Sequence, residues 1–360
     1  MTAQKHSDDI QITNCHVHTF TTAHTPLYYP HRVVAVFRLV PGLLRFLRWA
    51  FRYLPWENVY DFLVRIENFH RTGNRGTQEK VFREVLHYYP SDARFVVLPM
   101  DMARIGHGPV QQDIRDQHDG LAALAQRPEY AGRVIPFATV FPDRAEAAHE
   151  FRRCIEELGF RGLKLYPKLG YAPDHPVLMQ EIYPLCVEHD LPVVTHCSRG
   201  GVYGKGWSRA QQDAVTDPRA YIPVMRAFPG LRLNLAHFGG DRDWKAYLTD
   251  GFDPEDPQAR EKNWVSLIAD MIRSGDYPNL YTDISYTIFK FSEYMPLLRL
   301  YLENDRMKDR VLFGSDFYMT RQEALSEKAV SIRLRDALGE PLFRQIAETN
   351  PRRWLGEPPL

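Results

Sequence analysis

The sequence has little cysteine, no surplus of charge and no pair of closely spaced metal-binding thiols. Its 360 residues include four cysteines: Cys15, Cys154, Cys186 and Cys197. So few cysteines, with no Cys-x-x-Cys pair, argue against a disulfide framework and a structural zinc finger. Lysine plus arginine equals aspartate plus glutamate, 45 against 45. A nucleic-acid partner is therefore not expected, because phosphate binding usually needs a basic surplus.

A secretory signal and a membrane span are also lacking. The first residues are polar, without the apolar core of a signal peptide. The most apolar stretch, residues 32–54, is interrupted by Pro41 and by four arginines, at positions 38, 45, 48 and 52. A span needs about 20 mostly uncharged apolar residues. We therefore expect a reduced, cytoplasmic protein without a membrane span.

Short apolar runs alternate with longer stretches of helical periodicity along the whole chain. The predicted strands are Gln11–Val17, Arg94–Met100, Arg133–Val140, Arg161–Tyr166, Leu191–His196, Leu231–His237, Asn279–Ile284 and Arg310–Gly314. Such runs are typical of strands buried on both faces of a parallel sheet. Helical patterns fill most gaps, for example Asp143–Leu158, where Asp143 and Glu146 resemble a capping box. Eight such units predict an α/β fold, a (β/α)8 barrel formed by one domain over residues 1–360. A Gly-x-Gly-x-x-Gly motif after the first strand is missing, which disfavours a dinucleotide-binding sheet.

One connection is much longer than the others. Residues 20–92 separate the first two predicted strands and include an aromatic and arginine-rich region, residues 32–69. We favour a lid over the barrel, because long loops at the active end of a barrel are usually functional. A helix lying on a membrane surface is the alternative, since basic and apolar side chains mix there.

The carboxyl ends of the predicted strands carry the residues of chemical interest. These ends form one mouth of a parallel barrel, where catalytic groups gather. They carry His16, His18, Lys164, His196, His237 and Asp316. The first two histidines are two residues apart on one strand, so both imidazoles face the same way. Singly, each residue has a structural explanation, such as a helix N-cap for Asp316. Together, imidazoles and a carboxylate predict a site for zinc or a similar divalent ion.

These residues and their neighbours resemble the amidohydrolase superfamily, and more narrowly the amidohydrolase-2 family of metal-dependent hydrolases and decarboxylases. The similar segments are His16-x-His18, Gly-Leu-Lys164-Leu-Tyr-Pro, Val-Val-Thr-His196, Ala-His237-Phe-Gly-Gly, Tyr-Thr-Asp283, Leu-Phe-Gly-Ser-Asp316 and Glu-Thr-Asn350-Pro-Arg-Arg-Trp-Leu-Gly. The resemblance runs from about residue 12 to 356. The sequence departs from it at Tyr166, where the family often has histidine, and at Cys197-Ser198, where it has Thr-Gly.

The resemblance implies a ligand set. It implies that His16, His18, His196 and Asp316 hold one ion, Zn²⁺ in the first place, with Mn²⁺, Fe²⁺ and Ni²⁺ left open. The ion would lower the pKa of water, and Asp316 would take the proton and later return it. His237 would polarise the substrate, act as an acid–base or bind a second ion. Lys164 would either be carboxylated and bridge two ions or, unmodified, orient a substrate carboxylate.

Three functions remain open at this point. The first is a metal-dependent hydrolase of an amide, lactone or ester of a small, carboxylate-bearing cyclic or aromatic substrate. The second is a non-oxidative decarboxylase of an aromatic or unsaturated acid, and the third is a non-catalytic binding barrel. Candidate substrate contacts are Arg199, whose guanidinium suits a carboxylate, together with Tyr286 and Tyr166. The expected partner is a small molecule, and a homo-oligomer is left open. Cys15 and Cys197 point away from the ligands and are interpreted as packing residues.

Overall fold

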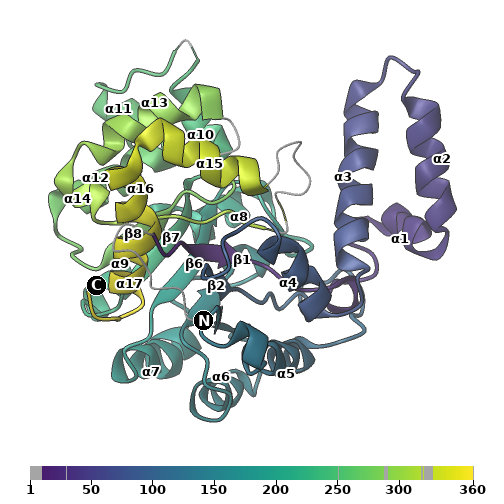
Figure 1. Ribbon diagram of the computed structural model, residues 1–360, viewed down its shortest axis with the longest axis horizontal. Helices are drawn as coiled ribbons and strands as arrows, with labels where there is room; N and C mark the ends of the chain where they lie inside the picture. Colours follow the sequence, from purple (N-terminus) through teal and green to yellow (C-terminus); the bar gives the residue numbers. More distant parts are fainter. Residues whose placement is uncertain are drawn as a thin grey trace, which may run out of the picture.

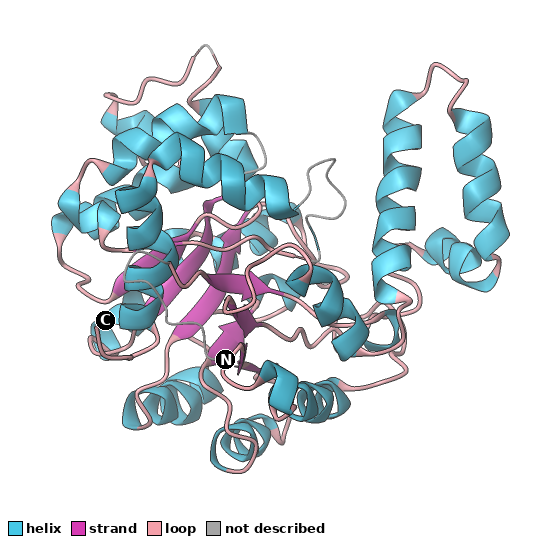
Figure 2. Ribbon diagram, in the orientation of Figure 1, coloured by secondary structure: helices cyan, strands magenta, loops and turns pink. Residues whose placement is uncertain are grey.

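Parallel strands form the centre of the molecule (Figure 2). The computed structural model describes residues 10–29, 31–249, 251–287, 291–317, 319 and 327–359. The strands are β1 Thr13–Val17, β2 Arg94–Val97, β3 Val134–Pro136, β4 Ala138–Thr139, β5 Leu163–Leu165, β6 Val193–Ser198, β7 Leu233–Gly239, β8 Leu280–Asp283 and β9 Val311–Leu312. Pairing is parallel throughout, in the orders β1-β2-β3 and β4-β5-β6-β7-β8-β9.

The two sheets are parts of one closed barrel. β3 and β4 are consecutive pieces of one strand, separated only by Phe137, whose N–H still donates to Val97 of β2 at 3.1 Å. At the other seam, the N–H of Cys15 donates to the carbonyl of Phe313 at 2.9 Å. Val17 also forms a parallel bridge with Phe317. Eight strand positions therefore close on themselves, which confirms the predicted (β/α)8 barrel.

Helices surround the barrel and cover its apolar outer face (Figure 1). They are α4 Gln78–Leu86, α5 Ile114–Ala125, α6 Ala147–Glu156, α7 Tyr183–Glu188, α8 Arg209–Thr216, α9 Ile222–Ala227, α10 Asp241–Ala246, α11 Pro257–Arg260, α12 Trp264–Ser274, α13 Phe291–Leu302, α14 Asp305–Lys308, α15 Glu327–Leu338, α16 Glu340–Arg344 and α17 Asn350–Trp354. Single 3₁₀ or π turns occur at Thr22–His24, Pro128–Tyr130, Pro167–Leu169, Leu178–Ile182, Pro218–Tyr221 and Gln345–Thr349.

The predicted capping box before α6 is wrong. The helix begins at Ala147, later than expected, and its N-cap residue Glu146 makes no side-chain capping bond. Asp143 lies 3.1 Å from His175, and the Glu146 carboxylate lies 3.5 Å from Arg144. The carboxylates of Asp143 and Glu146 thus contact residues outside the helix and do not cap it.

The long insertion forms a helical hairpin beside the barrel. It contains α1 Arg32–Leu39, α2 Pro41–Phe51 and α3 Glu57–Gly73, and residues 32–73 are called the arm below. Figure 1 shows α2 and α3 side by side, standing apart from the barrel with α1 near their base. The arm has a small core of its own: Val34, Phe37, Leu44, Leu63 and Ile66. Among the described residues, no helix is both long and apolar enough to cross a bilayer.

Candidate metal centre and cavity

The structure brings the six predicted metal-site residues to the carboxyl end of the barrel. His16 and His18 lie on and directly after β1, Lys164 on β5, His196 on β6 and His237 on β7, and Asp316 follows β9. All six residues are buried, with 6% exposure or less. Elements more than 100 residues apart in the sequence therefore supply one polar cluster above the apolar barrel interior.

His16, His18 and Asp316 form the first ligand group. Their ligand atoms lie within 4.8 Å of one another, with His18 Nε2 at 3.3 Å and His16 Nε2 at 3.9 Å from Asp316 Oδ1. The Nδ1 atom of His18 donates to the carbonyl of Leu98 at 2.7 Å. This outer bond leaves the Nε2 lone pair directed at the carboxylate, as in metal-bound histidines.

Asp316 Oδ1 provides the test of whether a cation fits. This buried oxygen has no hydrogen-bond donor among the residues that the structure describes. Buried carboxylate oxygens are normally satisfied, because leaving one without a partner costs free energy. An unsatisfied oxygen between two imidazole nitrogens matches the donor set that binds a divalent ion.

His196 and His237 form a second, adjacent pair. His196 Nδ1 lies 3.0 Å from His237 Nε2, while the outer nitrogens face carbonyls, Gly200 O at 3.0 Å and Ser285 O at 3.2 Å. If both outer nitrogens donate, the two inner lone pairs face each other, which is repulsive unless a cation or proton lies between them. The prediction that His196 shares an ion with His16 and His18 stays a prediction, since the closest partner of His196 is His237.

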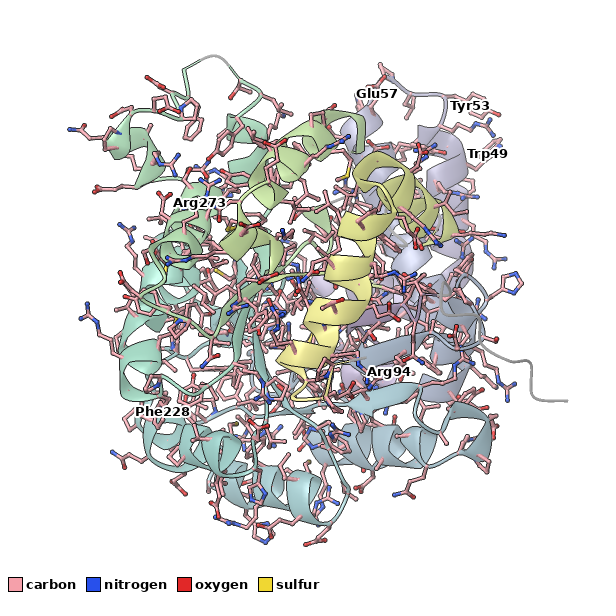
Figure 3. The ribbon with its side chains drawn as sticks, turned by 60° about the vertical axis from the view of Figure 1, so that its left-hand side comes forward. Trp49, Tyr53, Glu57, Arg94, Phe228 and Arg273 are labelled. Carbon is pink, nitrogen blue, oxygen red and sulfur yellow. The ribbon has the colours of Figure 1, made fainter. Side chains whose placement is uncertain are left out.

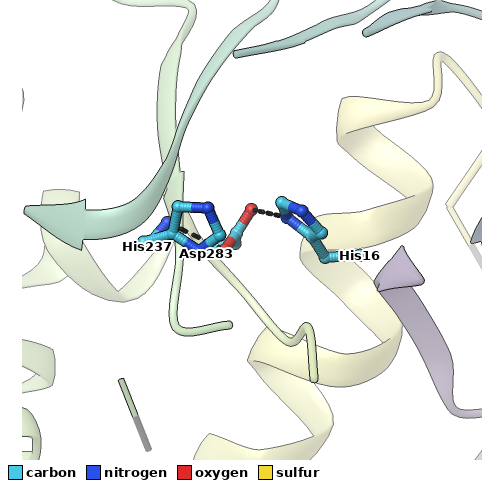
Figure 4. A group of neighbouring side chains, drawn as sticks. All are labelled: His16, His237 and Asp283. Carbon is cyan, nitrogen blue, oxygen red and sulfur yellow. Dashed lines mark hydrogen bonds and ion pairs between the residues drawn. The ribbon is translucent and has the colours of Figure 1, made fainter. Parts of the chain in front are cut away.

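Asp283, to which the sequence assigned no role, links the two groups. Figure 4 shows this carboxylate between His16 and His237. It accepts from His16 Nδ1 at 3.1 Å and from the backbone N–H of His237 at 3.1 Å. Asn234 Nδ2, at 2.8 Å, and Ser285 N, at 3.0 Å, donate to it as well. Because donors occupy both oxygens, Asp283 orients the histidines rather than offering a free lone pair.

Lys164 lies under the same cluster. Its ammonium nitrogen is 3.5 Å from His16 Nε2, the nitrogen that faces Asp316, and its side chain is fully buried. Burial lowers the pKa of Lys164 to about 8, although Asp283 and Asp316 act in the opposite direction. A buried primary amine thus points at the first ligand group.

Burial also keeps the imidazoles of His16, His196 and His237 neutral. It lowers the pKa of His16 to about 3, with Lys164 adding to the effect, and it lowers the pKa values of His196 and His237. The pKa of Asp316 lies below its ordinary value, although burial opposes ionisation of this carboxyl group. Neutral imidazoles beside an ionised carboxylate are the protonation states that metal binding requires.

Backbone strain is concentrated at the same strand ends. Four of the five described non-glycine residues with positive φ lie there: His237 at 71°, Phe238 at 41°, Tyr286 at 63° and Asp316 at 59°. Left-handed backbone is costly for residues with a Cβ and persists where the surrounding structure enforces it. The strain is consistent with a functional rather than a purely structural cluster.

A cavity of about 540 Å³ opens over the cluster. It is lined by all of the predicted site residues except Lys164. Its further lining combines the charged Arg38, Arg65, Arg209, Asp241 and Arg242 with ten apolar side chains: Phe20, Tyr29, Val34, Phe62, Ile66, Phe69, Met100, Met102, Val202 and Met319. The base of the arm supplies several of these side chains. Whether the arm moves as a lid stays a prediction.

The predicted substrate residues all line this cavity, but Arg199 is already engaged. Its guanidinium donates to Asp243 at 3.0 Å and to Asp213 at 3.3 Å, and it stacks on Trp264 at 4.2 Å. Four further arginines line the cavity, and the two that lie on barrel helices, Arg209 and Arg242, were missed by the sequence reasoning. Their position was a usable signal, because each follows a ligand-bearing strand, on α8 and α10.

A family profile decides the classification. The profile described as Amidohydrolase matches residues 14–356, nearly the whole chain. The chain belongs to the amidohydrolase family. It is therefore an enzyme of the metal-dependent hydrolase and decarboxylase type, as the resemblance implied. No curated protein sequence matches the chain.

Solved structures similar to this amidohydrolase share its fold at low sequence identity. A 5-carboxyvanillate decarboxylase from Novosphingobium aromaticivorans, complexed with manganese and 4-hydroxy-3-methoxy-5-nitrobenzoic acid, is 15% identical over 97% of each chain, with a TM-score of 0.56. A probable 2-pyrone-4,6-dicarboxylic acid hydrolase from Acinetobacter baumannii, with citric acid bound, is 12% identical over 96% of this chain and all of the other, with a TM-score of 0.55. An uncharacterised TIM-barrel protein from Bordetella bronchiseptica is 17% identical over 96% and 99%, with a TM-score of 0.54.

Proposed function

We propose that this amidohydrolase hydrolyses an amide, ester or lactone bond of a small cyclic or aromatic acid, using two divalent ions, Zn²⁺ in the first place. One ion would be held by His16, His18 and Asp316 and the other by His196 and His237. Lys164, carboxylated on its nitrogen, would bridge the two groups. When bound, the ions would acidify a water and polarise the scissile carbonyl.

The position of Lys164 carries this proposal. An ammonium 3.5 Å from His16 Nε2 would repel a divalent cation bound by that nitrogen. Addition of carbon dioxide to the neutral amine replaces this positive charge with a carboxylate, a suitable ligand. Full burial of the side chain excludes bulk water from the resulting carbamate.

Residues of the chain would carry out proton transfer, orient His16 and bind the substrate. Asp316 Oδ1, which has no donor among the described residues, would accept the proton of the attacking water and return it to the leaving group. Asp283 keeps the proton of His16 on Nδ1 through its 3.1 Å hydrogen bond. The apolar wall of the cavity would bury the substrate ring, and Arg209 and Arg242 would attract its carboxylate.

The first test is a product assay with a matched variant. Purified holoenzyme is incubated with a panel of lactones, esters and amides of cyclic acids, and with aromatic acids. Ring opening or ester cleavage that Asp316→Asn abolishes even at saturating metal, with its circular dichroism kept, supports the proposal. Full turnover by Asp316→Asn would refute its role as proton acceptor.

Lys164 is tested separately. Holoenzyme supplied with ¹³C-labelled bicarbonate should show a carbamate carbon resonance that Lys164→Ala lacks. In the same variant, a short carboxylic acid such as acetate should restore part of the activity by filling the vacated position. No carbamate signal and no rescue would exclude the bridging role.

Decarboxylation is the second candidate, and the same lysine favours it if unmodified. Its pKa of about 8 leaves it mostly protonated at neutral pH, as a buried cation suited to a substrate carboxylate. The solved neighbour that decarboxylates an aromatic acid makes this chemistry worth testing. Release of carbon dioxide from the aromatic acids, without hydrolysis in the rest of the panel, would select it.

A further inference from the structure

The arm carries most of the exposed large apolar side chains of the described structure. Ten of the fourteen lie between residues 28 and 62. The most exposed of these ten are Phe46 at 59%, Trp49 at 61%, Tyr53 at 71% and Trp56 at 57%. Figure 3 shows Trp49 and Tyr53 on the outer side of the arm, directed away from the rest of the molecule. Their concentration on one projecting element is unusual for a surface, where single apolar residues are normally scattered.

Phe46, Trp49 and Tyr53 belong neither to the core of the arm nor to the lining of the cavity. The opposite side of α2 already packs into the arm's own core through Leu43, Leu44, Leu47 and Phe51. None of the residues that line the cavity comes from α2. The helix is thus apolar on two sides, and a helix of that kind is normally covered on both. Phe46 and Trp49 of α2, with Tyr53 just beyond its end, form the second apolar face and contact one another in sequence, with ring centroids 6.1 and 6.2 Å apart.

The aromatic face is flanked by positive charge. No aspartate or glutamate occurs between His18 and Glu57, whereas five arginines do. Three of them, Arg45, Arg48 and Arg52, alternate with the aromatic residues and are exposed. Arg48 pairs with Glu67 of α3 at 2.9 Å. The whole arm has seven arginines and three carboxylates, although the chain as a whole is neutral.

We propose that the outer face of α2 binds the surface of an anionic phospholipid bilayer. Phe46, Trp49 and Tyr53 enter the boundary between headgroups and acyl chains, where aromatic rings with a polar edge are favoured. Arg45 and Arg52 pair with lipid phosphates. A second copy of the chain is a poorer occupant, because a two-fold contact through this face would bring the same arginines together without facing carboxylates.

Vesicle co-sedimentation of the full-length enzyme tests this proposal. The probes are phosphatidylcholine vesicles with and without phosphatidylserine at about a third of the lipid. The enzyme should sediment with the anionic vesicles, much less with the neutral ones, and less in high salt because the charges are screened. Arg45→Gln with Arg52→Gln should weaken binding about 25-fold, at about fivefold for each arginine. Trp49→Ala with Tyr53→Ala should weaken it by about tenfold or more.

Matched variants away from the arm control for net charge and exposed apolar area. Arg152→Gln with Arg226→Gln removes the same charge from α6 and α9, and Leu300→Ala with Ile332→Ala removes exposed apolar side chains from α13 and α15. Both should bind like wild type. No binding to anionic vesicles, or equal losses in arm and control variants, would overturn the proposal. So would a wild-type dimer that Trp49→Ala with Tyr53→Ala converts to a monomer in sedimentation velocity, because a second copy would then cover this face.

Discussion

Replacing Asp283 with asparagine should weaken metal binding without touching a proposed ligand. Asp283 Oδ2 accepts from His16 Nδ1 and Asn234 Nδ2, whereas Oδ1 accepts from the backbone N–H groups of His237 and Ser285. Backbone donors cannot reverse their direction, so the new amide NH₂ group should take the Oδ2 position. There it would face His16 Nδ1 and stabilise the tautomer that carries its proton on Nε2. That proton would occupy the position of the metal.

The expected loss of metal affinity follows because Asp283 orients the proposed ligand His16. Removing a carboxylate that orients a metal-bound histidine typically lowers metal affinity 10- to 100-fold, which is about 1.4–2.7 kcal/mol. The Asn234 Nδ2 group, which now donates to Asp283 Oδ2, would lose its acceptor. This should cost a further ~1–3 kcal/mol in the free energy of unfolding. The assay is titration of metal-free protein with Zn²⁺ or Mn²⁺ against a chromophoric chelator. The matched control is Asp276→Asn, the same change at an exposed position shortly before β8.

Nitrogen NMR separates this account from direct ligation by Asp283. In the metal-free protein, ¹⁵N spectra should show the His16 proton on Nδ1 in wild type and on Nε2 in Asp283→Asn. Metal affinity within twofold of wild type, or an unchanged His16 tautomer, would refute the reasoning.

Three further outcomes are expected. Burial raises the pKa of Glu150, but hydrogen bonds from His118 and Arg153 outweigh it and hold the pKa at about 2, below the unfolded value of about 4.3. The stabilisation by the ionised Glu150 is therefore complete above pH ~5 and is lost as the pH falls through the pKa of the folded state. In urea titrations, Glu150→Gln should lower the free energy of unfolding by about 3 kcal/mol at pH 7 and by little near pH 2. Gly201 has φ of +94°, and an added Cβ would meet the Tyr166 hydroxyl and lie 2.8 Å from His196 Cε1. Gly201→Ala should therefore lower turnover at least tenfold. Full activity of this variant would show that this part of the cavity does not hold substrate. Removal of bound metal by a chelator should lower the melting temperature. Adding the ion back at about 100 times its Kd should raise the free energy of unfolding by ~2.7 kcal/mol. A melting temperature independent of metal would contradict a site formed only in the folded state.

The barrel and the position of the site were predictable because both depend on strand periodicity. Apolar runs of the right length mark the strands, and the last residues of parallel strands must meet at one end. His16, His18 and Asp316 could therefore be placed near one another from sequence position alone. The closed (β/α)8 topology is confirmed by the strand order and by the hydrogen bond from the Cys15 N–H to the carbonyl of Phe313.

The partners within the site could not be predicted, because they depend on the direction of individual rings. The strand pattern predicts that His196 lies at the mouth of the barrel. The contact between its Nδ1 and His237 Nε2 is seen only in the structure. Asp283 is one of many acidic residues in the sequence, and its function arises from donors on two other strands, β1 and β7. Arg199 seemed available for substrate because Asp213, Asp243 and Trp264, which engage it, are distant in sequence.

Anomalous diffraction at a metal edge tests the central claim most directly. Crystals of the enzyme grown with Zn²⁺ or Mn²⁺ should show a peak about 2.0–2.2 Å from His16 Nε2, His18 Nε2 and Asp316 Oδ1. A second peak is expected between His196 Nδ1 and His237 Nε2, with Lys164 density reaching both. Full metal content in the crystal without any peak among these atoms would contradict the account.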